Sequence, residues 1–512
     1  MSILSALGAS DGSTYIVYWK PVGPPTNIEL RVQRLDASGV PVYGTDGMLV
    51  SSAMNMSTST AIGSAVLDGE DNLYIGITAT GDEQGHVFKL DPDGNHLWDS
   101  GGVTFAGGYG IVILPLSSGE AVVSWLNIPN ALMQKYDALG QPVWPSPQPI
   151  ESGTSKTAPG EMFELSNGDV EAIFHTYSFG ISSTLWAQRF EGVSGAPVWS
   201  SPVQLSNKTT VWNTRYSVGQ IDDAVYIGYK AASGLRFDSF LQRINPDGAI
   251  PWGINGSDFD LNETDYEMDT RIAIGTGAVW SLCNYKDPSQ AENGERIQKF
   301  DSETGARLFT DYAKEVYPIG SDNVHASGLF LRNEAPFFLM ESGWDNGASV
   351  TSLHLVALDA EGDFLWPEET QPMALFEASK SNTHLTRLVG NQTVGVWMED
   401  KSSGPAVYAQ NYEFEGGNSS VTSPALPSEF RFLPNPVADV LTCAFEAQQA
   451  MNVEWRVYNS LGRLVDAQRL GVGSGSQTMR WTVSDWPAGV YHVHGVLDSE
   501  VHLRSQTIVV QH

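Results

Sequence analysis

Aromatic side chains recur near the ends of short apolar segments along most of the chain, and a histidine joins them in one segment. Flat aromatic faces complement the apolar faces of sugar rings, so such residues gathered on one surface could bind a polysaccharide. The alternative is packing, because aromatic residues in strands more often lie in the core. The candidate ligand-binding residues are Trp19, Trp125, His175, Tyr177, Tyr229, Tyr285, Trp344 and Trp397.

Carboxylates lie close to several of these aromatics. Two carboxyl groups at a suitable separation hydrolyse glycosidic bonds, but that separation is defined in space and not along the sequence. Solvated loop carboxylates are the alternative, so no catalytic residue is assigned. The acidic candidates are Asp287 and Glu292 in one long loop, Asp345 in a second, and Glu399 with Asp400 after Trp397.

No cofactor is predicted. Residues 91–95 (Asp-Pro-Asp-Gly-Asn) carry oxygen ligands at alternate positions, as calcium loops do. They lie in a repeated turn whose sister copy has Ala138 and Leu139 instead, so a hairpin turn is the prediction and calcium the alternative. The sequence also lacks zinc-ligand spacing, a Gly-x-Ser-x-Gly elbow and a phosphate loop.

A repeated phrase indicates which elements must position these residues. It has the form apolar-Gln-(Lys/Arg)-apolar-Asp-x-x-Gly-x-x-x-Trp and returns roughly every 50 residues, as in repeat architectures. Two further strands and a tight turn precede each copy, so each unit offers a four-stranded meander. The copies span residues 33–43, 88–98, 134–144, 188–199, 242–252, 298–309 and 358–366, with a degraded eighth at 408–416.

Units of this kind bury their faces when they are arranged radially, so residues 1–416 are predicted to form a β-propeller. The glycine suits a turn with positive φ, and the Trp on the outer strand can fill the wedge between neighbouring blades. Eight copies predict eight blades. Seven is the alternative, because the last copy lacks both the aromatic residue and a clear outer strand.

Two copies, residues 35–39 (Leu-Asp-Ala-Ser-Gly) and 358–362 (Leu-Asp-Ala-Glu-Gly), resemble the tryptophan docking repeat of quinoprotein dehydrogenase propellers. Those propellers have eight blades, so the resemblance supports this count. The adjacent cysteine pair of that family is missing, so the resemblance implies the fold and not a quinone cofactor. The four-residue spacing from Gly to Trp also differs from the three of a sialidase Asp box.

The repeat stops at a small-residue linker, residues 417–427, and a second domain, residues 428–512, follows it. Turn formers alternate there with strands, which predicts a small immunoglobulin-like β-sandwich. The domain resembles the type A C-terminal sorting domain of Bacteroidetes type IX (Por) secretion cargo. The residues that carry the resemblance are Pro434, Asn435, Pro436, Gly462, Arg463, Gly489 and Tyr491.

The resemblance implies a partner, the type IX secretion machinery, and an extracellular destination. It also implies removal of the tail, followed by release or by attachment to surface lipopolysaccharide. Residues 1–10 lack the features of a signal peptide, so we expect an export signal to have preceded them.

Composition narrows the remaining partners. The chain has 28 Lys and Arg against 59 Asp and Glu, a net charge of −31, which disfavours nucleic acid and anionic membranes. Its apolar runs are too short for a membrane span. Cys283 and Cys443 fall in different domains, so no disulfide is expected. The sequence therefore predicts an exported all-β protein that recognises a polysaccharide or a surface partner; a carbohydrate-active hydrolase or lyase and a structural or adhesion protein are the alternatives.

Overall fold

The structure, a computed structural model, describes fifteen segments of the chain. They fall into two compact units, Met1–Glu415 and Gly416–His512, and their elements are strands and turns. The described part contains no helix with the length and apolar character that a membrane crossing requires. The segment predicted as a linker, 417–427, lies outside it. The described residues are 1–22, 27–56, 63–153, 155–177, 183–210, 216–320, 324–343, 351–401, 404–414, 431–447, 451–459, 463–472, 475–497, 501–502 and 506–511.

The strands of the first unit form eight successive antiparallel meanders, numbered here as blades. Blade 1 is β1 (Ser2–Gly8), β2 (Thr14–Pro21), β3 (Asn27–Leu35) and β4 (Met48–Asn55), and blade 2 is β5 (Gly63–Leu67), β6 (Leu73–Ala79), β7 (Gln84–Leu90) and β8 (Val103–Ala106). Blade 3 is β9 (Tyr109–Pro115), β10 (Ala121–Asn127), β11 (Asn130–Tyr136) and β12 (Gln148–Ile150), and blade 4 is β13 (Lys156–Glu164), β14 (Val170–Tyr177), β15 (Ser183–Phe190) and β16 (Val203–Gln204).

The second half continues the pattern. Blade 5 is β17 (Ser217–Ile221), β18 (Ala224–Ser233), β19 (Arg236–Ile244) and β20 (Ser257–Asp258); blade 6 is β22 (Arg271–Gly275), β23 (Ala278–Lys286), β24 (Asn293–Asp301) and β25 (Lys314–Gly320), with β21 (Tyr266–Glu267) also on β23. Blade 7 is β26 (His325–Arg332), β27 (Ala335–Ser342), β28 (Thr351–Ala357) and the first part of β29 (Thr370–Leu385). Blade 8 is the last part of β29 with β30 (Gln392–Lys401) and β31 (Gly404–Glu413).

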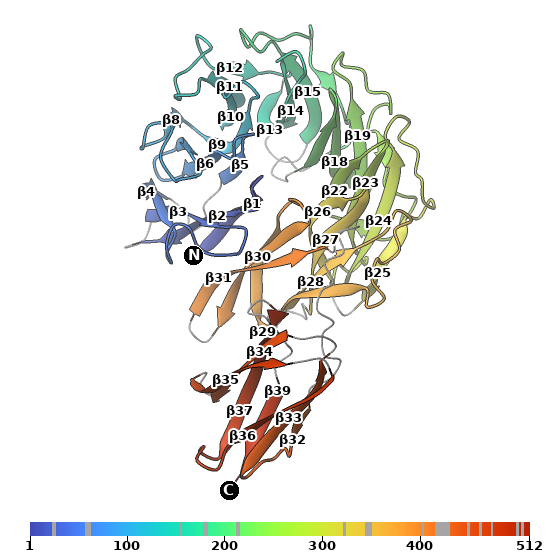
Figure 1. Ribbon diagram of the computed structural model, residues 1–512. Helices are drawn as coiled ribbons and strands as arrows, with labels where there is room; N and C mark the ends of the chain where they lie inside the picture. The colour runs from blue at the N-terminus through green and yellow to red at the C-terminus, as the bar shows by residue number, and fades with distance from the viewer. Residues whose placement is uncertain are drawn as a thin grey trace. The chain divides into compact units, whose positions relative to one another are not determined.

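The first strand of each blade is the inner strand, and successive inner strands contact one another around the unit. Between β13 and β17 the link is a hydrogen bond from the Gln220 amide to the Glu164 carbonyl, at 3.0 Å. The last blade returns to the first, so that β1 and β2 lie beside β30 and β31 (Figure 1) and Ile3 packs with Val396. The ring is therefore closed, and the predicted eight-bladed β-propeller is confirmed.

The Trp that ends four of the repeated phrases docks on the following blade through the same pair of contacts. The Trp98 indole Nε1 donates to the Ala138 carbonyl at 3.2 Å, and its ring covers Gly140 so closely that a Cβ there would lie 2.9 Å from the indole Cγ. Gly140 has a φ of 79°, which also favours glycine. The same pairing recurs with Trp144, Gly192 and Gly195; with Trp199, Pro246 and Gly248; and with Trp252, Glu303 and Gly305 as donor, acceptor and covered glycine.

The glutamine and the basic residue of the phrase complete the joint. Gln134 Nε2 closes its own outer hairpin by donating to the Trp144 carbonyl at 3.1 Å, and Lys135 Nζ crosses to the Gly192 carbonyl of the next blade at 3.2 Å. Arg189 reaches the Pro246 carbonyl at 2.8 Å in the same way. The residues that recur in the repeated phrase are therefore the ones that join each blade to the next.

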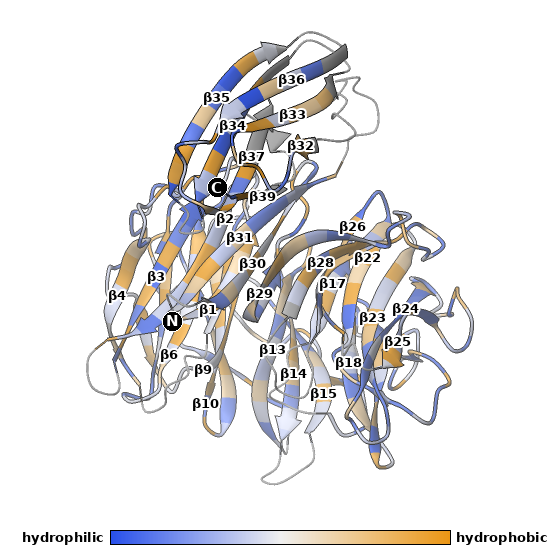
Figure 2. Ribbon diagram, turned by 90° about the horizontal axis from the view of Figure 1, so that it is seen from below, coloured by the Kyte–Doolittle hydropathy of each residue, from blue (hydrophilic) through white to orange (hydrophobic). Residues whose placement is uncertain are grey.

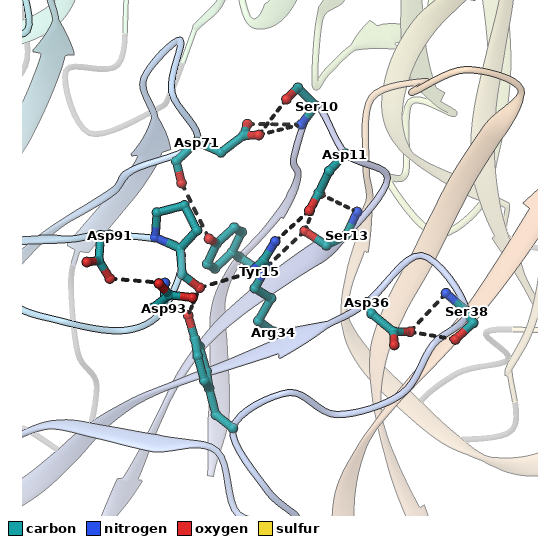
Figure 3. A network of polar contacts seen from close by, with 12 residues as sticks. Ser10, Asp11, Ser13, Tyr15, Arg34, Asp36, Ser38, Asp71, Asp91 and Asp93 are labelled. Atoms are coloured by element: carbon teal, nitrogen blue, oxygen red, sulfur yellow. Dashed lines mark hydrogen bonds and ion pairs between the residues drawn. The ribbon is translucent and has the colours of Figure 1, made fainter.

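A second set of contacts joins the turns between the first and second strands. The Ser10 amide and hydroxyl donate to the Asp71 carboxylate of the next blade, with the amide at 2.9 Å (Figure 3). Because these turns meet around one end of the ring, the inner strands all begin at the opposite end. The same clasp joins Ser117 to Glu164, Ser166 to Asp223 and Thr276 to Glu334.

The second unit is a sandwich of two antiparallel sheets, in agreement with the predicted immunoglobulin-like fold. Its core contains Leu441, Trp455 and Trp481. Figure 2 shows apolar segments along the strands of both units and hydrophilic ones at many of the turns. One sheet is β32 (Arg431–Leu433), β33 (Val440–Ala447) and β36 (Gly475–Thr482); the other is β34 (Met451–Asn459), β35 (Leu464–Val472), β37 (Gly489–Leu497), β38 (Val501–His502) and β39 (Gln506–Val510).

The sorting-domain residues lie at turns and strand starts. Asn435 Oδ1, between Pro434 and Pro436, accepts the Val509 amide at 2.9 Å. Arg463 precedes β35, Gly489 begins β37 and Tyr491 Oη donates to the Pro487 carbonyl at 2.7 Å. Gly462 lies outside the described residues.

Docking of Trp98 on Gly140 predicts a specific loss of stability in the G140A variant. Gly119 is a matched control, because its φ is 83° but no atom lies within 4 Å of a Cβ placed there. Both variants should lose about 1 kcal/mol from the strained backbone conformation. Only G140A should lose a further ~1–3 kcal/mol from overpacking against the indole. Urea denaturation measures both free energies of unfolding, and equal losses would contradict the docking interpretation.

Candidate functional site

Most of the aromatic candidates lie between blades. Trp19 is buried in the core of blades 1 and 2, and the Trp125 ring lies 4.2 Å from the Phe105 ring. Trp397 is buried with its Nε1 donating to Glu399 Oε2 at 2.9 Å. These three side chains pack blades together, which is the alternative that the sequence left open. Trp344 and Asp345 lie outside the described residues.

The structure places Tyr229 at a cavity of about 540 Å³ that spans the inner parts of blades 5 to 7. Its walls come from different repeats, at the end of the ring where the inner strands begin. Arg271 is the first residue of β22, Asp269 lies two residues before it, and Lys230 lies in the last part of β18. The residues used below are Tyr216, Tyr229, Lys230, Asp269, Arg271 and Phe330.

His175 supports one wall of this cavity from behind. Tyr216 Oη and His175 Nδ1 form a hydrogen bond at 2.6 Å, and the two rings stack with their centroids 4.6 Å apart. Burial lowers the pKa of His175 to about 3, so the imidazole is neutral at neutral pH. Tyr177 does not line the cavity; its Oη donates to the Pro129 carbonyl at 2.9 Å. His175 therefore positions Tyr216.

Tyr285 belongs to a buried acidic group behind another wall. Its Oη donates to Asp260 Oδ2 at 2.6 Å. Nearby, Glu267 Oε2 accepts the Ser239 amide at 2.8 Å, and the Ser239 hydroxyl contacts that of Thr270, a cavity residue, at 2.7 Å. Burial, followed by the charge of Asp260, raises the pKa of Glu267 to about 10. Glu267 is therefore protonated at neutral pH.

The pKa of Asp269 is shifted in the opposite direction to that of Glu267. A hydrogen bond from His325, with Nε2 3.2 Å from Oδ2, holds the pKa of Asp269 well below its usual range, and Arg271 and Lys230 lower it further. The carboxylate is thus ionised, and it lines the same cavity as the two cations. An ionised carboxylate beside a histidine can move a proton or orient a hydroxyl group.

The other acidic candidates lie away from this cavity. Asp287 accepts the amides of Ala291 and Glu292, each at 2.8 Å, and such bonds within its own loop lower its pKa to about 2. Glu399 is buried and pairs with Lys380 at 3.4 Å. Asp400 lies on β30 and does not line the cavity.

The possible calcium loop forms a hairpin turn. Asp91 Oδ1 accepts the amides of Asp93 at 3.0 Å and Asn95 at 2.8 Å, so its oxygens serve the turn (Figure 3). Among the residues that the structure describes, no group of three or more His, Cys, Asp and Glu side chains is arranged to hold a metal ion.

Sequence reasoning missed Tyr216, Lys230, Asp269, Arg271 and His325. They come from separate repeats and belong to no motif. One signal was present but could be used only once the strands were aligned: the inner strands β13, β22 and β26 begin with the basic residues Lys156, Arg271 and His325.

Because Glu267 is buried, we expect the free energy of unfolding to depend on pH, and we expect the E267Q variant to remove this dependence. In the unfolded chain the pKa of Glu267 lies near its ordinary value of 4.5, whereas the folded carboxyl keeps its proton until about pH 10. The native free energy of unfolding therefore falls as pH rises from 4.5. Relative to the native chain, E267Q should gain about 3 kcal/mol between pH 4.5 and pH 7.

The control is E263Q, which makes the same substitution at an exposed position four residues earlier. Urea denaturation at both pH values measures the difference. A gain in E263Q equal to that in E267Q, or no gain in E267Q, would contradict a neutral buried Glu267.

Solved structures give only weak likenesses. A puromycin hydrolase mutant complexed with PGG has 12% identity and a TM-score of 0.40 over 87% of this chain and 58% of that one. The acylaminoacyl peptidase of Pyrococcus horikoshii has 9% identity and a TM-score of 0.39 over 77% and 58%. The α-L-arabinanase of Penicillium chrysogenum, complexed with arabinobiose, has 11% identity and a TM-score of 0.33 over 60% and 92%. This chain thus spans little more than half the length of the first two proteins, and identities this low assign no activity.

The sequence as a whole matches none of the curated proteins. Its second unit does match a known family. Residues 431–511 fit the secretion system C-terminal sorting domain. The match confirms the resemblance found in the turns at Asn435, Gly489 and Tyr491, and the second unit of this chain is the sorting domain of a type IX secretion cargo.

Proposed function

We propose that the first unit is an exported propeller that recognises a polysaccharide in the cavity lined by Tyr216, Lys230, Asp269 and Arg271. The observation that carries the proposal is this cavity of about 540 Å³, which combines aromatic walls with convergent charged groups. Volumes of this order are typical of sites for small ligands or for a few units of a polymer. The aromatic walls could stack on a sugar ring while the charged groups fix its hydroxyl groups.

Positioning of the aromatic wall supports recognition. Tyr216 is held by a stacked imidazole and by a hydrogen bond to it, so little side-chain freedom remains to be lost when a ligand binds. Tyr229 is fixed as well, because its Oη donates to the Asn255 carbonyl at 2.8 Å. The cavity is thus shaped before the ligand arrives.

A carbohydrate-active enzyme is the second candidate, and Asp269 is the observation that favours it. Its ionised carboxylate contacts His325 at the cavity, so the pair could supply a base and an acid. Neither His175 nor Tyr177 would take part directly, since His175 is buried and Tyr177 does not line the cavity. We place recognition first because the other carboxyls near this wall, Glu267 and Glu295, are buried.

The sorting domain accounts for delivery. Its family marks the chain as cargo that is exported by the type IX machinery. We propose that the tail is then removed and that the propeller is released or attached to surface lipopolysaccharide. The propeller would thus meet its ligand outside the cell.

Loss of the Tyr216 ring should weaken polysaccharide binding. We expect Y216A to lower affinity for the bound polysaccharide roughly tenfold, since a stacking ring and its buried area contribute about 1–2 kcal/mol. Y216F should keep most of the affinity because the ring remains. Y312A is the control, because Tyr312 is 60% exposed on the outer part of blade 6. Isothermal titration of the full chain with neutral and anionic polysaccharides measures the constants.

Two outcomes would contradict recognition. One is the absence of binding to every polysaccharide. The other is release of new reducing or unsaturated ends that D269N abolishes, which would establish the enzyme instead. Equal affinities of Y216A and Y312A would move the site away from the cavity.

Removal of the tail should stop export. A chain shortened to residues 1–430, expressed with an export signal in a bacterium that has the type IX system, should remain in the periplasm. The full chain should reach the medium or the cell surface. Fractionation followed by immunoblotting measures this distribution, and thermal unfolding of the shortened chain checks that the propeller is intact. Export of an intact shortened chain would show that the tail is not required.

A further inference from the structure

The cavity differs in charge from the rest of the protein. The chain carries a net charge of −31, but the cavity wall contains Lys230 and Arg271 against Asp269 alone. Arg271 forms no ion pair with the described carboxylates; its Nη1 donates to the Asp269 carbonyl at 3.2 Å. In a chain with twice as many acids as bases, an arginine without a carboxylate partner is notable because it leaves donors available to a ligand.

Two further carboxyl groups lie near this wall but do not line the cavity. Glu267 and Glu295 are buried, and burial raises the pKa of each above its ordinary value. The ionised Asp269 is shared with His325 at 3.2 Å. The charged side chains that line the cavity itself are therefore two cations and one carboxylate.

Three of the inner strands begin with a basic residue at the end of the ring where the cavity lies. The clasps at one end use the acids Asp71, Glu164, Asp223 and Glu334. At the other end, no inner strand from β1 to β26 begins with an acidic residue, and β13, β22 and β26 begin with Lys156, Arg271 and His325. A concave site that collects one sign of charge focuses its field on a ligand of the opposite sign.

We propose that Arg271 and Lys230 form a binding site for the anionic group of a polysaccharide, either a uronic acid carboxylate or a sulfate ester. This inference rests on the proposed function and specifies the ligand class. Guanidinium donors match the planar spacing of carboxylate and sulfate oxygens, and lysine adds a second positive charge. Against a net charge of −31, such local cations are what would let an anionic polymer approach.

The test compares binding of three probes to the full chain: polygalacturonate, dextran sulfate and neutral dextran. We expect at least one anionic probe to bind and dextran not to bind. R271Q and K230Q should each weaken that binding roughly tenfold, the loss expected for one charge-assisted hydrogen bond. R271K should keep only part of the affinity, because lysine lacks the paired N–H donors of the guanidinium group. High salt should weaken binding further.

K20Q is the matched control. Lys20 lies in the last part of β2, as Lys230 does in β18, and pairs with Glu29 at 3.3 Å outside the cavity. The K20Q variant removes the same charge as K230Q but at a site outside the cavity. Its affinity for the anionic probe should therefore equal that of the native chain. Thermal unfolding of each variant confirms that the fold is retained. If R271Q fails to fold, the affinities of K230Q and R271K are compared with that of K20Q instead.

The outcomes separate this inference from the proposed function. Binding of polygalacturonate, dextran sulfate or both, with the variant losses above, supports the anion site, and the preferred probe identifies the anion. Dextran binding that K230Q and R271Q leave unchanged would overturn the anion site but keep polysaccharide recognition. Failure of all three probes would overturn the anion site, and failure of other neutral polysaccharides as well would overturn recognition. Equal losses in K20Q and K230Q would show that net charge, and not the cavity, controls binding.

Discussion

Docking of one aromatic ring on the glycine of the next blade is the contact on which the propeller depends. Each blade is a meander whose faces need a neighbour, and the ring brings both apolar area and an N–H donor to that neighbour. Trp98 uses both, since its indole covers Gly140 and donates to the Ala138 carbonyl. The glycine is required twice, because its φ is positive and because a Cβ would meet the indole. Two independent constraints thus fall on one residue, which is why Gly-x-x-x-Trp is the clearest signal in the sequence.

The phrase predicted the fold well because it records contacts between sequential neighbours. Its period predicted eight blades, its glycine predicted a turn with positive φ, and its Trp predicted a ring packed between neighbouring blades. The structure contains all three features. The sorting domain was recognisable for a different reason: its turns, at Asn435-Pro436 and at Gly489, lie at fixed positions in a small sandwich. In both units, local chemistry and global fold agree.

The cavity could not be predicted in the same way. Tyr216 and His175 are 41 residues apart, and Asp269 and His325 are 56 residues apart, so no spacing relates them. They meet only because inner strands of different blades begin at one end of the ring. The aromatic candidates show the converse: Trp125 and Trp397 lie on second strands, but their rings pack against the neighbouring sheets. Strand position fixes the end of the ring at which a residue lies, whereas only packing decides whether its side chain reaches solvent.

The joint between blades 8 and 1 shows which contacts close the ring. Gly39 has no atom within 4 Å of a Cβ placed on it, so no aromatic residue docks there among the described residues. Closure instead uses apolar packing of β1 and β2 against β30, together with the Arg387 Nε bond to the Gly8 carbonyl at 3.1 Å. The cavity lies elsewhere, between blades with complete docking contacts such as Trp199 on Gly248 and Trp252 on Gly305. Its residues are thus held between docked blades, and a site fixed in this way loses less conformational freedom when it binds a ligand.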